Sequence, residues 1–453
     1  MTRIAVNEGY GRSAESNGSI LRNVVLQKRR CRTYPARCRT RKTELITVYR
    51  VKRFVELLGI CIVAGVWMTE MSAEAEASSP ANETHTNWTR GTFSDPKFFP
   101  LAVWLQSPAN AARYRAAGIN TFVALWKGPT EEQLKALKSA GMKVICEQND
   151  FALRHRDDDT IIGWMHGDEP DNAQSLGEGK GWGLAVLPKK IQEDYGRIKA
   201  ADPTRPVLLN LGQGVAWDGW YGRGTRSRHP EDYPEYVKGS DIVSFDIYPV
   251  VHDSPEVAGK LWLVAEGVQR LLQWSGGKKL VWNCLECTHI GNPERKATPQ
   301  QVRAAAWMSL IHGSRGLIYF VHQFKPNFRA AALLDDSELL EAVTKLNQQI
   351  TDLAPALNSP TITNGISVKS SNQEVPVAAM VKELEGAAYV FAVGMREGST
   401  TASFALKGIK GKRTVEVLRE NRTIEARDGA FEDRFAAWEV HLYRVEPELN
   451  NYQ

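Results

Sequence analysis

The chain has few cysteines, and their number argues against a disulfide framework. Three of the six, Cys146, Cys284 and Cys287, follow residue 75, and an odd count leaves no complete set of pairs. Cys284 and Cys287 have the spacing of a redox or metal pair, but no second cysteine pair or cluster of histidines accompanies them. They straddle the end of an apolar run that is typical of a strand, where their side chains would point to opposite faces. We therefore expect buried thiols.

The chain also lacks an apolar run long enough to favour a stable membrane-spanning helix. The stretch Val55–Met68 is short and is interrupted by Glu56. It follows the basic segment Arg50–Arg53 and precedes an Ala-x-Ala cleavage site that ends at Ala75, which is the arrangement of a signal peptide. We expect residues 1–75 to be a basic preface plus signal peptide, absent from a mature protein that is secreted or periplasmic and has no membrane span.

Excess positive charge is confined to the N-terminus. The net charge is +5, but residues 1–75 contain 14 Lys and Arg against 6 Asp and Glu, while the remainder contains 43 against 46. The folded part therefore gives no reason to expect a nucleic-acid partner. We interpret the long Arg-rich stretch 1–47 as an over-extended gene start, with translation from near Val48. The alternative is a nucleic-acid-binding arm.

What the sequence does have is a long alternation of strand-like and helix-like segments. Residues 76–95 are rich in Ser, Thr, Asn and Ala and indicate a flexible linker. Eight apolar runs then alternate with helical patterns, which favours an α/β fold, a (β/α)8 TIM barrel over residues 96–357, rather than a doubly wound sheet. Short alternating runs follow and predict a small antiparallel β-sandwich domain over residues 358–453. The expected barrel strands are Leu101–Leu105, Thr121–Trp126, Lys143–Glu147, Ile161–His166, Val207–Asn210, Ile242–Tyr248, Lys279–Glu286 and Gly316–His322.

The other expected elements come from helical spacing within the barrel and from strand-like alternation after it. The expected helices are Glu131–Gly141, Pro188–Ala201, Glu256–Trp274, Pro299–His312 and Ser337–Leu357. The expected strand segments of the C-terminal domain are Pro376–Val393, Thr401–Leu406, Thr414–Leu418 and Phe435–Val445.

Two glutamates stand where a barrel of this kind places its functional residues. Glu169 follows the fourth expected strand, in Ile161-Ile-Gly-Trp-Met-His-Gly-Asp-Glu-Pro170, and Glu286 ends the seventh, in Lys279-Leu-Val-Trp-Asn-Cys-Leu-Glu286. Active sites of such barrels gather at the carboxyl ends of the strands. A pair of carboxyl groups, one protonated and one ionised, is what hydrolysis of a glycosidic bond requires. For either residue alone, the alternative is a helix cap or an ion-pair partner.

In these features the chain resembles the clan A glycoside hydrolases, which are retaining enzymes on (β/α)8 barrels. The string Thr298-Pro-Gln-Gln-Val-Arg-Ala-Ala-Ala-Trp-Met-Ser-Leu-Ile-His-Gly-Ser-Arg-Gly-Leu-Ile-Tyr-Phe320 is similar to the passage between strands seven and eight of family 42-like β-galactosidases and related secreted glycosidases. The resemblance implies that 96–357 is a catalytic barrel, with Glu169 as acid/base and Glu286 as nucleophile of a double displacement. It implies no metal or other cofactor, and an oligo- or polysaccharide as the substrate.

The resemblance also implies roles for polar neighbours of the two glutamates. Asp168 stands where the clan usually has an Asn that holds the sugar 2-hydroxyl; an aspartate can accept a hydrogen bond there but cannot donate one. Its charge would raise the pKa of Glu169, which suits a proton donor. Tyr248, at the end of the sixth expected strand, would hydrogen-bond the nucleophile or pack against the following loop. Asp246 would be a supporting residue or a structural cap.

Aromatic residues are candidates for contacts with a sugar. Trp104 and Trp126 end the first two expected strands and would form the floor of a pocket, unless they only pack at the barrel rim. His322 or Phe324 stands where the clan often has a Trp at the end of strand eight. The connection 212–234 would either wall the substrate site or pack on itself; its aromatic residues include Trp217, Trp220, Tyr221 and Tyr233.

Two other functions are compatible with such a barrel. A non-catalytic glycan-binding protein on a glycosidase-like barrel would be favoured by the loss of either glutamate, but both are present. A metal-dependent hydrolase would need clustered ligands such as a His-x-His on the first strand, which reads Leu101-Ala-Val-Trp-Leu-Gln106. The sequence leaves the sugar, the linkage and the oligomeric state open.

Overall fold

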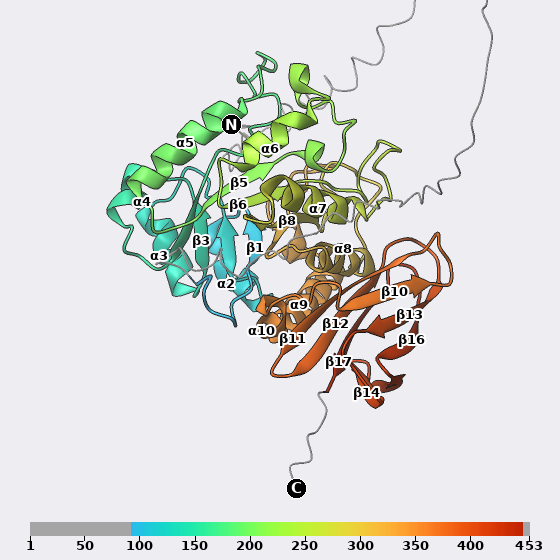
Figure 1. The fold of residues 1–453 in the computed structure, drawn as a ribbon. Helices are drawn as coiled ribbons and strands as arrows, with labels where there is room; N and C mark the ends of the chain where they lie inside the picture. The colour runs from blue at the N-terminus through green and yellow to red at the C-terminus, as the bar shows by residue number, and fades with distance from the viewer. Residues whose placement is uncertain (1–91, 447–453) are drawn as a thin grey trace, which may run out of the picture. The chain divides into compact units, whose positions relative to one another are not determined.

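The fold is a parallel (β/α)8 barrel followed by an antiparallel β domain (Figure 1). The computed structural model describes residues 92–446, so the expected signal peptide and most of the expected linker lie outside the described residues. The parallel sheet runs in the order β7-β6-β5-β4-β3-β2-β1-β9-β8. β7 (Leu280–Val281) and β8 (Asn283–Glu286) are two parts of one strand, interrupted at Trp282. Because β7 pairs with β6 and β8 pairs with β9, the sheet closes into the barrel.

The remaining barrel strands are short, and each is followed by a helix or a long connection. The strands are β1 (Leu101–Trp104), β2 (Thr121–Val123), β3 (Lys143–Cys146), β4 (Ile161–Met165), β5 (Val207–Leu211), β6 (Ile242–Phe245) and β9 (Leu317–Phe320). The helices are α2 (Ala111–Ala116), α3 (Glu131–Ser139), α4 (Asp150–Arg154), α5 (Pro188–Ala201), α6 (Tyr233–Val237), α7 (Leu263–Ser275), α8 (Pro299–Ile311), α9 (Ser337–Asp352) and α10 (Ala354–Asn358).

Local sequence signals set the starts of several helices. Thr130 and Gln133 form a reciprocal capping box at the start of α3, and Thr298 and Gln301 form another at the start of α8. In each box the Thr hydroxyl accepts a hydrogen bond from the Gln backbone, and the Gln side chain accepts one from the Thr backbone. These boxes begin the two helices at the residues that the sequence pattern predicts.

The strands are buried on both faces, and the period of two decides which side chains enter the barrel. On β1, Ala102 and Trp104 belong to the interior cluster, while Leu101 and Val103 pack toward the helices. On β5, Leu208 points inward, which also places Asn210, two residues later, on the inward face. Polar residues at the ends of the strands therefore reach a common space at one end of the barrel.

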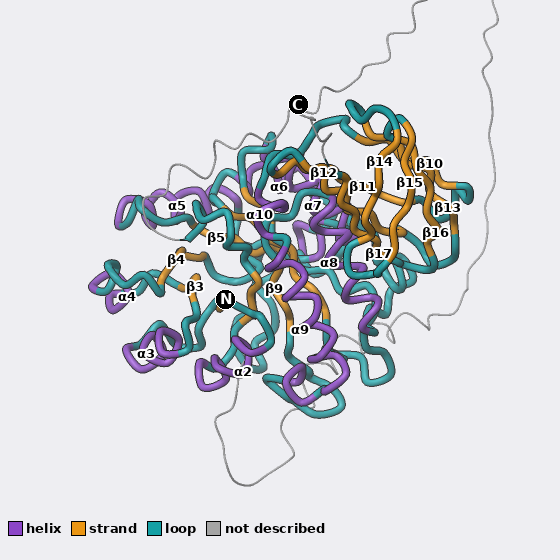
Figure 2. Tube along the Cα trace, turned by 90° about the horizontal axis from the view of Figure 1, so that it is seen from below, coloured by secondary structure: helices purple, strands orange, loops and turns teal. Residues whose placement is uncertain are grey.

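The C-terminal domain is one antiparallel sheet of eight strands, in the order β10-β13-β16-β15-β14-β17-β12-β11 (Figure 2). Its two edge strands, β10 and β11, also contact each other, so the sheet curls around a core of its own, as the expected β-sandwich does. The strands are β10 (Ile366–Ser370), β11 (Val377–Leu384), β12 (Ala387–Gly394), β13 (Thr400–Leu406), β14 (Lys412–Val417), β15 (Arg422–Arg427), β16 (Ala430–Phe435) and β17 (Val440–Val445).

Helix α8 carries the main contact between the barrel and the β domain, beside β12 (Figure 1). The ring of Trp307 stacks on that of Phe391, with centroids 5.4 Å apart and planes 20° apart. The Arg396 guanidinium lies 3.5 Å from the centroid of the Trp262 ring. The core of the barrel thus continues into one face of the β domain, and both belong to one compact unit.

The barrel strands begin within one residue of the expected positions, whereas the β domain differs more. The expected segment Pro376–Val393 is a hairpin of β11 and β12, turned by Glu385 and Gly386, both with positive φ. Three strands, β10, β15 and β16, were not expected, because their exposed faces are polar and few apolar residues mark them. Within residues 92–446 no helix is both long and apolar enough to cross a membrane.

Candidate active site at the carboxyl ends of the barrel strands

Glu169 lies just beyond β4 in an unusual backbone conformation. Its φ is 39°, in the left-handed region. A residue other than glycine is strained there by about 1–3 kcal/mol, and such strain is concentrated at functional sites. Its carbonyl oxygen accepts hydrogen bonds from the Asn172 backbone (3.0 Å) and the Gln174 side chain (3.1 Å), which hold the turn. The Glu169 side chain is half-buried, so surrounding protein can shift its pKa while part of it stays accessible.

A buried amide joins two further carboxyl groups beside this turn. Asn210, on the inward face of β5, is 1% exposed. Its Nδ2 donates to Asp168 Oδ1 at 3.0 Å and to Asp246 Oδ1 at 3.3 Å. Its Oδ1 accepts a 2.7 Å hydrogen bond from the Ser244 hydroxyl, which orients the amide. The ends of β4, β5 and β6 therefore bring Asp168 and Asp246 within reach of one nitrogen atom.

Burial and mutual repulsion raise the pKa of the carboxyl groups gathered here. Burial first, and then the charges of Asp246, Asp168 and Asp171, hold the pKa of Glu169 well above its ordinary value. Burial and the charge of Asp246 raise the pKa of Asp168 to about 7, against the hydrogen bond from Asn210. A carboxyl group with such a pKa keeps its proton near neutral pH, as a general acid must.

Asp246 has neighbours that favour its ionised form. Burial raises the pKa of Asp246, whereas the Cys284 thiol, the Asn210 amide and the Tyr248 hydroxyl act to lower it. The Tyr248 hydroxyl lies beside Asp246, although no hydrogen bond of ordinary length and angle joins them. Cys284 is a buried thiol that faces the barrel interior, while Cys287 packs on the helix side of the strand, as the spacing predicts.

Glu286 is held in a different way. Its side chain is 7% exposed, and both carboxylate oxygens accept backbone hydrogen bonds, from Val250 N–H at 2.7 Å and Val251 N–H at 3.0 Å. Burial raises the pKa of Glu286 to about 7, while these two hydrogen bonds and the charge of Arg295 lower it. Glu286 therefore holds the connection between β6 and α7, which begins with Asp246, by hydrogen bonds to its backbone.

The three other expected substrate-binding residues lie along the inside and the rim of the barrel. Trp104 is 3% exposed and belongs to the interior cluster. His322 is 2% exposed, its Nε2 lies 3.2 Å from the Gln106 amide, and burial lowers its pKa to about 4, so the ring is neutral. Trp126 lies beyond β2 and is half-buried; its carbonyl accepts from Gln133, and its indole N–H has no partner among residues 92–446.

The connection after β5, residues 212–234, is rich in aromatic residues and is linked to Glu169 through the Asn172 side chain. Trp220 Nε1 donates to Asn172 Oδ1 at 2.7 Å, and the Asn172 side chain in turn acts to lower the pKa of the Glu169 carboxyl group. The Tyr221 ring lies next to Trp220, with centroids 5.1 Å apart, and is 64% exposed. Of the aromatic residues in this connection, Trp220 is therefore linked to the neighbour of Glu169, and Tyr221 lies beside Trp220.

Two residues that organise this site have only a weak signal in the sequence. Asn210 was expected only as the end of the fifth strand, yet it is the one polar residue in the apolar run Val207–Leu211, and that contrast is the signal for it. Asp171 is fully buried and accepts hydrogen bonds from Gly212 N–H (2.9 Å) and the Tyr233 hydroxyl (3.0 Å). It ties the connection after β4 to the connection after β5.

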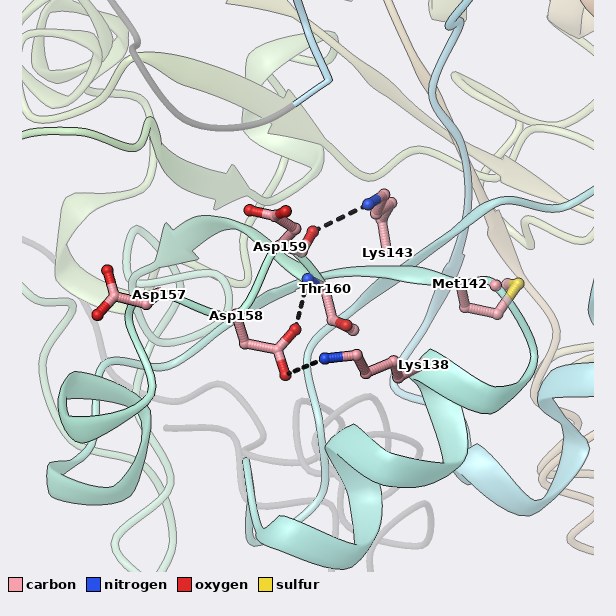
Figure 3. Close-up of a pocket in the computed structure, with 8 residues that line it drawn as sticks. Lys138, Met142, Lys143, Asp157, Asp158, Asp159 and Thr160 are labelled. Carbon is pink, nitrogen blue, oxygen red and sulfur yellow. Dashed lines mark hydrogen bonds and ion pairs between the residues drawn. The ribbon is translucent and has the colours of Figure 1, made fainter.

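A pocket of about 250 Å³ lies at the opposite end of the barrel, where β3 and β4 begin (Figure 3). Both lysines that line it have partners there: Lys138 pairs with Asp158 at 3.5 Å, and Lys143 donates to the Asp159 carbonyl at 3.0 Å. Polar contacts at this end of a barrel serve stability. Across the described part of the chain, no group of three or more His, Cys, Asp or Glu side chains is arranged to hold a metal ion.

Comparison with known proteins identifies likeness of fold only. No protein-family model and no curated protein matches the chain. Among solved structures, a putative α-galactosidase/melibiase from Bacteroides fragilis is 9% identical, with 77% of this chain and 79% of that chain covered and a TM-score of 0.49. An α-amylase from Anoxybacillus is 11% identical (78% and 99% covered, TM-score 0.46). A GH30 endoxylanase from Clostridium papyrosolvens is 10% identical (77% and 96% covered, TM-score 0.43).

Proposed function

We propose that the chain is a glycoside hydrolase that cleaves an O-glycosidic bond of an oligo- or polysaccharide, with Glu169 as the proton donor. The observation that carries the proposal is the state of Glu169. It is a half-buried carboxyl group on a strained turn at the carboxyl end of β4, and burial and neighbouring carboxylates raise its pKa. Such a group holds a proton near neutral pH and can give it to the leaving-group oxygen.

The reaction also needs an ionised carboxylate beside the anomeric carbon. The family resemblance implies Glu286, and Asp246 is the carboxylate whose charge acts most strongly on Glu169. With either group the proposed course is a double displacement with net retention. Glu169 first protonates the leaving oxygen and then, as a carboxylate, takes a proton from the water that releases the sugar.

The test is hydrolysis of a panel of aryl glycosides and polysaccharides by the purified protein and by Glu169→Gln. We expect the variant to lose about 10²- to 10⁴-fold in kcat/KM on substrates with poor leaving groups, the usual contribution of a general acid. The matched control is Glu193→Gln on the exposed face of α5, which should keep the parent rate. Glycan binding without hydrolysis on any substrate would contradict the proposal and favour a non-catalytic glycan-binding protein.

We also propose that the protein is exported, from the basic segment, apolar run and Ala-x-Ala site before residue 76. N-terminal sequencing of the exported protein should then find a start near Glu76. A start well before residue 70 would contradict this proposal without affecting the proposed activity.

A further inference from the structure

The geometry separates the roles of Asp246 and Glu286. Asp246 shares the Asn210 amide with Asp168, the residue next to Glu169, through contacts of 3.3 Å and 3.0 Å. Its side chain is half-buried, as are those of Asp168 and Glu169. A carboxylate that must reach a sugar needs to be near the proton donor and not fully buried. Asp246 is half-buried, and its charge acts more strongly on Glu169 than that of any other carboxylate.

Glu286 is committed to the protein backbone instead. Each of its oxygens accepts a hydrogen bond from one of two consecutive amides, at 2.7 Å and 3.0 Å, and 7% of its side chain is exposed. Backbone donors draw electron density from a carboxylate, and the pair of bonds fixes it facing the connection. The two amides, of Val250 and Val251, lie four and five residues after Asp246. Glu286 therefore anchors the segment that carries Asp246 and Tyr248.

Residues that follow Glu286 in the chain add further contacts to the same connection. Asn292 Nδ2 donates to the Val251 carbonyl at 3.1 Å and to Asp253 at 3.2 Å, and Arg295 pairs with Asp253 at 2.8 Å. Both partners follow β8, the strand that ends with Glu286. A site whose reacting groups must stay within a fraction of an ångström needs such a supporting layer.

We propose, building on the glycosidase function above, that Asp246 is the catalytic nucleophile that works with Glu169, and that Glu286 is a positioning residue for the 246–251 segment. In the first step a carboxylate oxygen of Asp246 bonds to the anomeric carbon as the bond from that carbon to the leaving oxygen breaks, and Glu169 gives its proton to that oxygen. In the second step Glu169 takes a proton from water, whose oxygen bonds to the anomeric carbon and releases the Asp246 carboxylate.

The neighbours of Asp246 and of Glu169 agree with this division of roles. Burial raises the pKa of Asp246, and the Cys284 thiol, the Asn210 amide and the Tyr248 hydroxyl act against it, in favour of the ionised form that a nucleophile needs. Glu169 has three carboxylates around it, which favour its protonated form. Burial raises the pKa of both groups, but the donors around Asp246 offset that effect, whereas the charges around Glu169 add to it. This contrast is what distinguishes a nucleophile from a proton donor.

The direct test traps the covalent intermediate on the unmodified protein. A 2-deoxy-2-fluoro glycoside of the best substrate found in the panel should inactivate the enzyme and leave a label that survives tryptic digestion. Because Lys238, Lys260, Lys279 and Arg295 delimit the cleavage products, Asp246 falls in peptide 239–260 and Glu286 in peptide 280–295. We expect the label on Asp246. A label on Glu286, or on Asp168, would overturn the assignment while leaving the glycosidase function intact.

Azide rescue gives the second readout, and it separates nucleophile from positioning residue. Asp246→Ala should lose on the order of 10³-fold or more in kcat, and azide should restore turnover as a glycosyl azide of inverted configuration. Glu286→Ala should also lose activity, without rescue by azide, and Glu286→Gln should recover part of it because its amide oxygen still accepts one backbone bond. Azide rescue of Glu286→Ala, or a product of inverted configuration from the parent enzyme, would contradict the proposal. Absence of hydrolysis on every substrate would instead contradict the proposed function itself.

Discussion

At the scale of single residues, the site is a set of carboxyl groups whose ionisation states depend on one another. Glu169 is next to Asp168 in sequence, Asn210 of β5 hydrogen-bonds both Asp168 and Asp246, and the charge of Asp246 acts on Glu169. Removing a proton from one group makes removal from the next more costly, because like charges at short distance repel in a medium of low dielectric constant. The pH dependence of the protein should therefore report on this cluster in two ways.

The alkaline limb of the pH–activity profile should report on the proton of Glu169. If Glu169 is the donor, kcat/KM on a substrate with a poor leaving group should persist above pH 4.5, the ordinary pKa of a Glu, and fall as pH rises through the raised pKa of Glu169. Asn172→Ala removes a side chain that lowers this pKa, so it should move the limb to higher pH. Glu169→Gln should abolish the limb; a limb that stays in place in that variant would belong to another group.

The stability of the fold should also depend on pH through this cluster. The folded pKa of Asp168, about 7, is above its ordinary value of 3.8, so its protonated form is favoured in the folded protein. The stability that this preference contributes is present below pH 3.8 and is lost as pH rises through 7. We expect Asp168→Asn to reduce the loss of unfolding free energy between pH 5 and pH 8 by about 1–3 kcal/mol. Denaturant unfolding at pH 5 and at pH 8 measures this difference in unfolding free energy. The control is Asp159→Asn, an exposed residue at the opposite end of the barrel.

At the scale of elements, long connections rather than strands build the surroundings of Glu169. Asp171, fully buried, accepts bonds from Gly212 and Tyr233 at the two ends of the connection after β5. Asp171→Ala would leave both donors without their acceptor inside the protein, at a cost of about 1–3 kcal/mol for each buried group. The connection should then open locally, and trypsin should cut faster after Arg228, which is exposed within it.

The matched control for that experiment is Asp218→Ala in the same connection. Asp218 pairs with Arg270 at 2.7 Å, but its side chain is 64% exposed, so its ion pair is worth little. Trypsin should cut this variant after Arg228 at the parent rate. Equal acceleration in both variants would mean that Asp171 has no special part in holding the connection.

Sequence patterns predict these elements far better than they predict the contacts between them. Alternation and helix-capping signals are local, which is why the eight barrel strands and the start of α8 agree with expectation. The partners of Glu286 could not be predicted, because they are backbone amides that lie 36 and 35 residues earlier in the chain and are brought close by barrel closure. The same holds for Asn210: its inward direction follows from the period of two, but its two carboxylate partners come from β4 and β6.

At the scale of the whole molecule, the barrel and the β domain share buried surface. One hydrophobic cluster contains residues of α8 and α9 together with Phe391 and Val393 of β12. A second cluster, which includes Phe404 and Phe431, lies inside the β domain alone. Continuity of the first cluster predicts that neither part is stable without the other, since separation would expose large aromatic side chains to water.

Replacement of one aromatic residue in each cluster tests this. Phe391→Ala removes the ring that stacks on Trp307 and should cost about 3–5 kcal/mol, the usual range for a buried phenylalanine. The Phe431 ring stacks on that of Phe404, with centroids 4.7 Å apart, inside the β domain's own core. Phe431→Ala should lower the free energy of unfolding by a similar amount. If the two parts unfold together, each variant should show one thermal transition, lowered in temperature, with hydrolytic activity and β-sheet signal lost together. A shared core should make a defect inside the β domain a defect of the barrel as well. If Phe431→Ala instead loses its β-sheet signal early and keeps its activity until a second transition, the barrel is stable without the β domain.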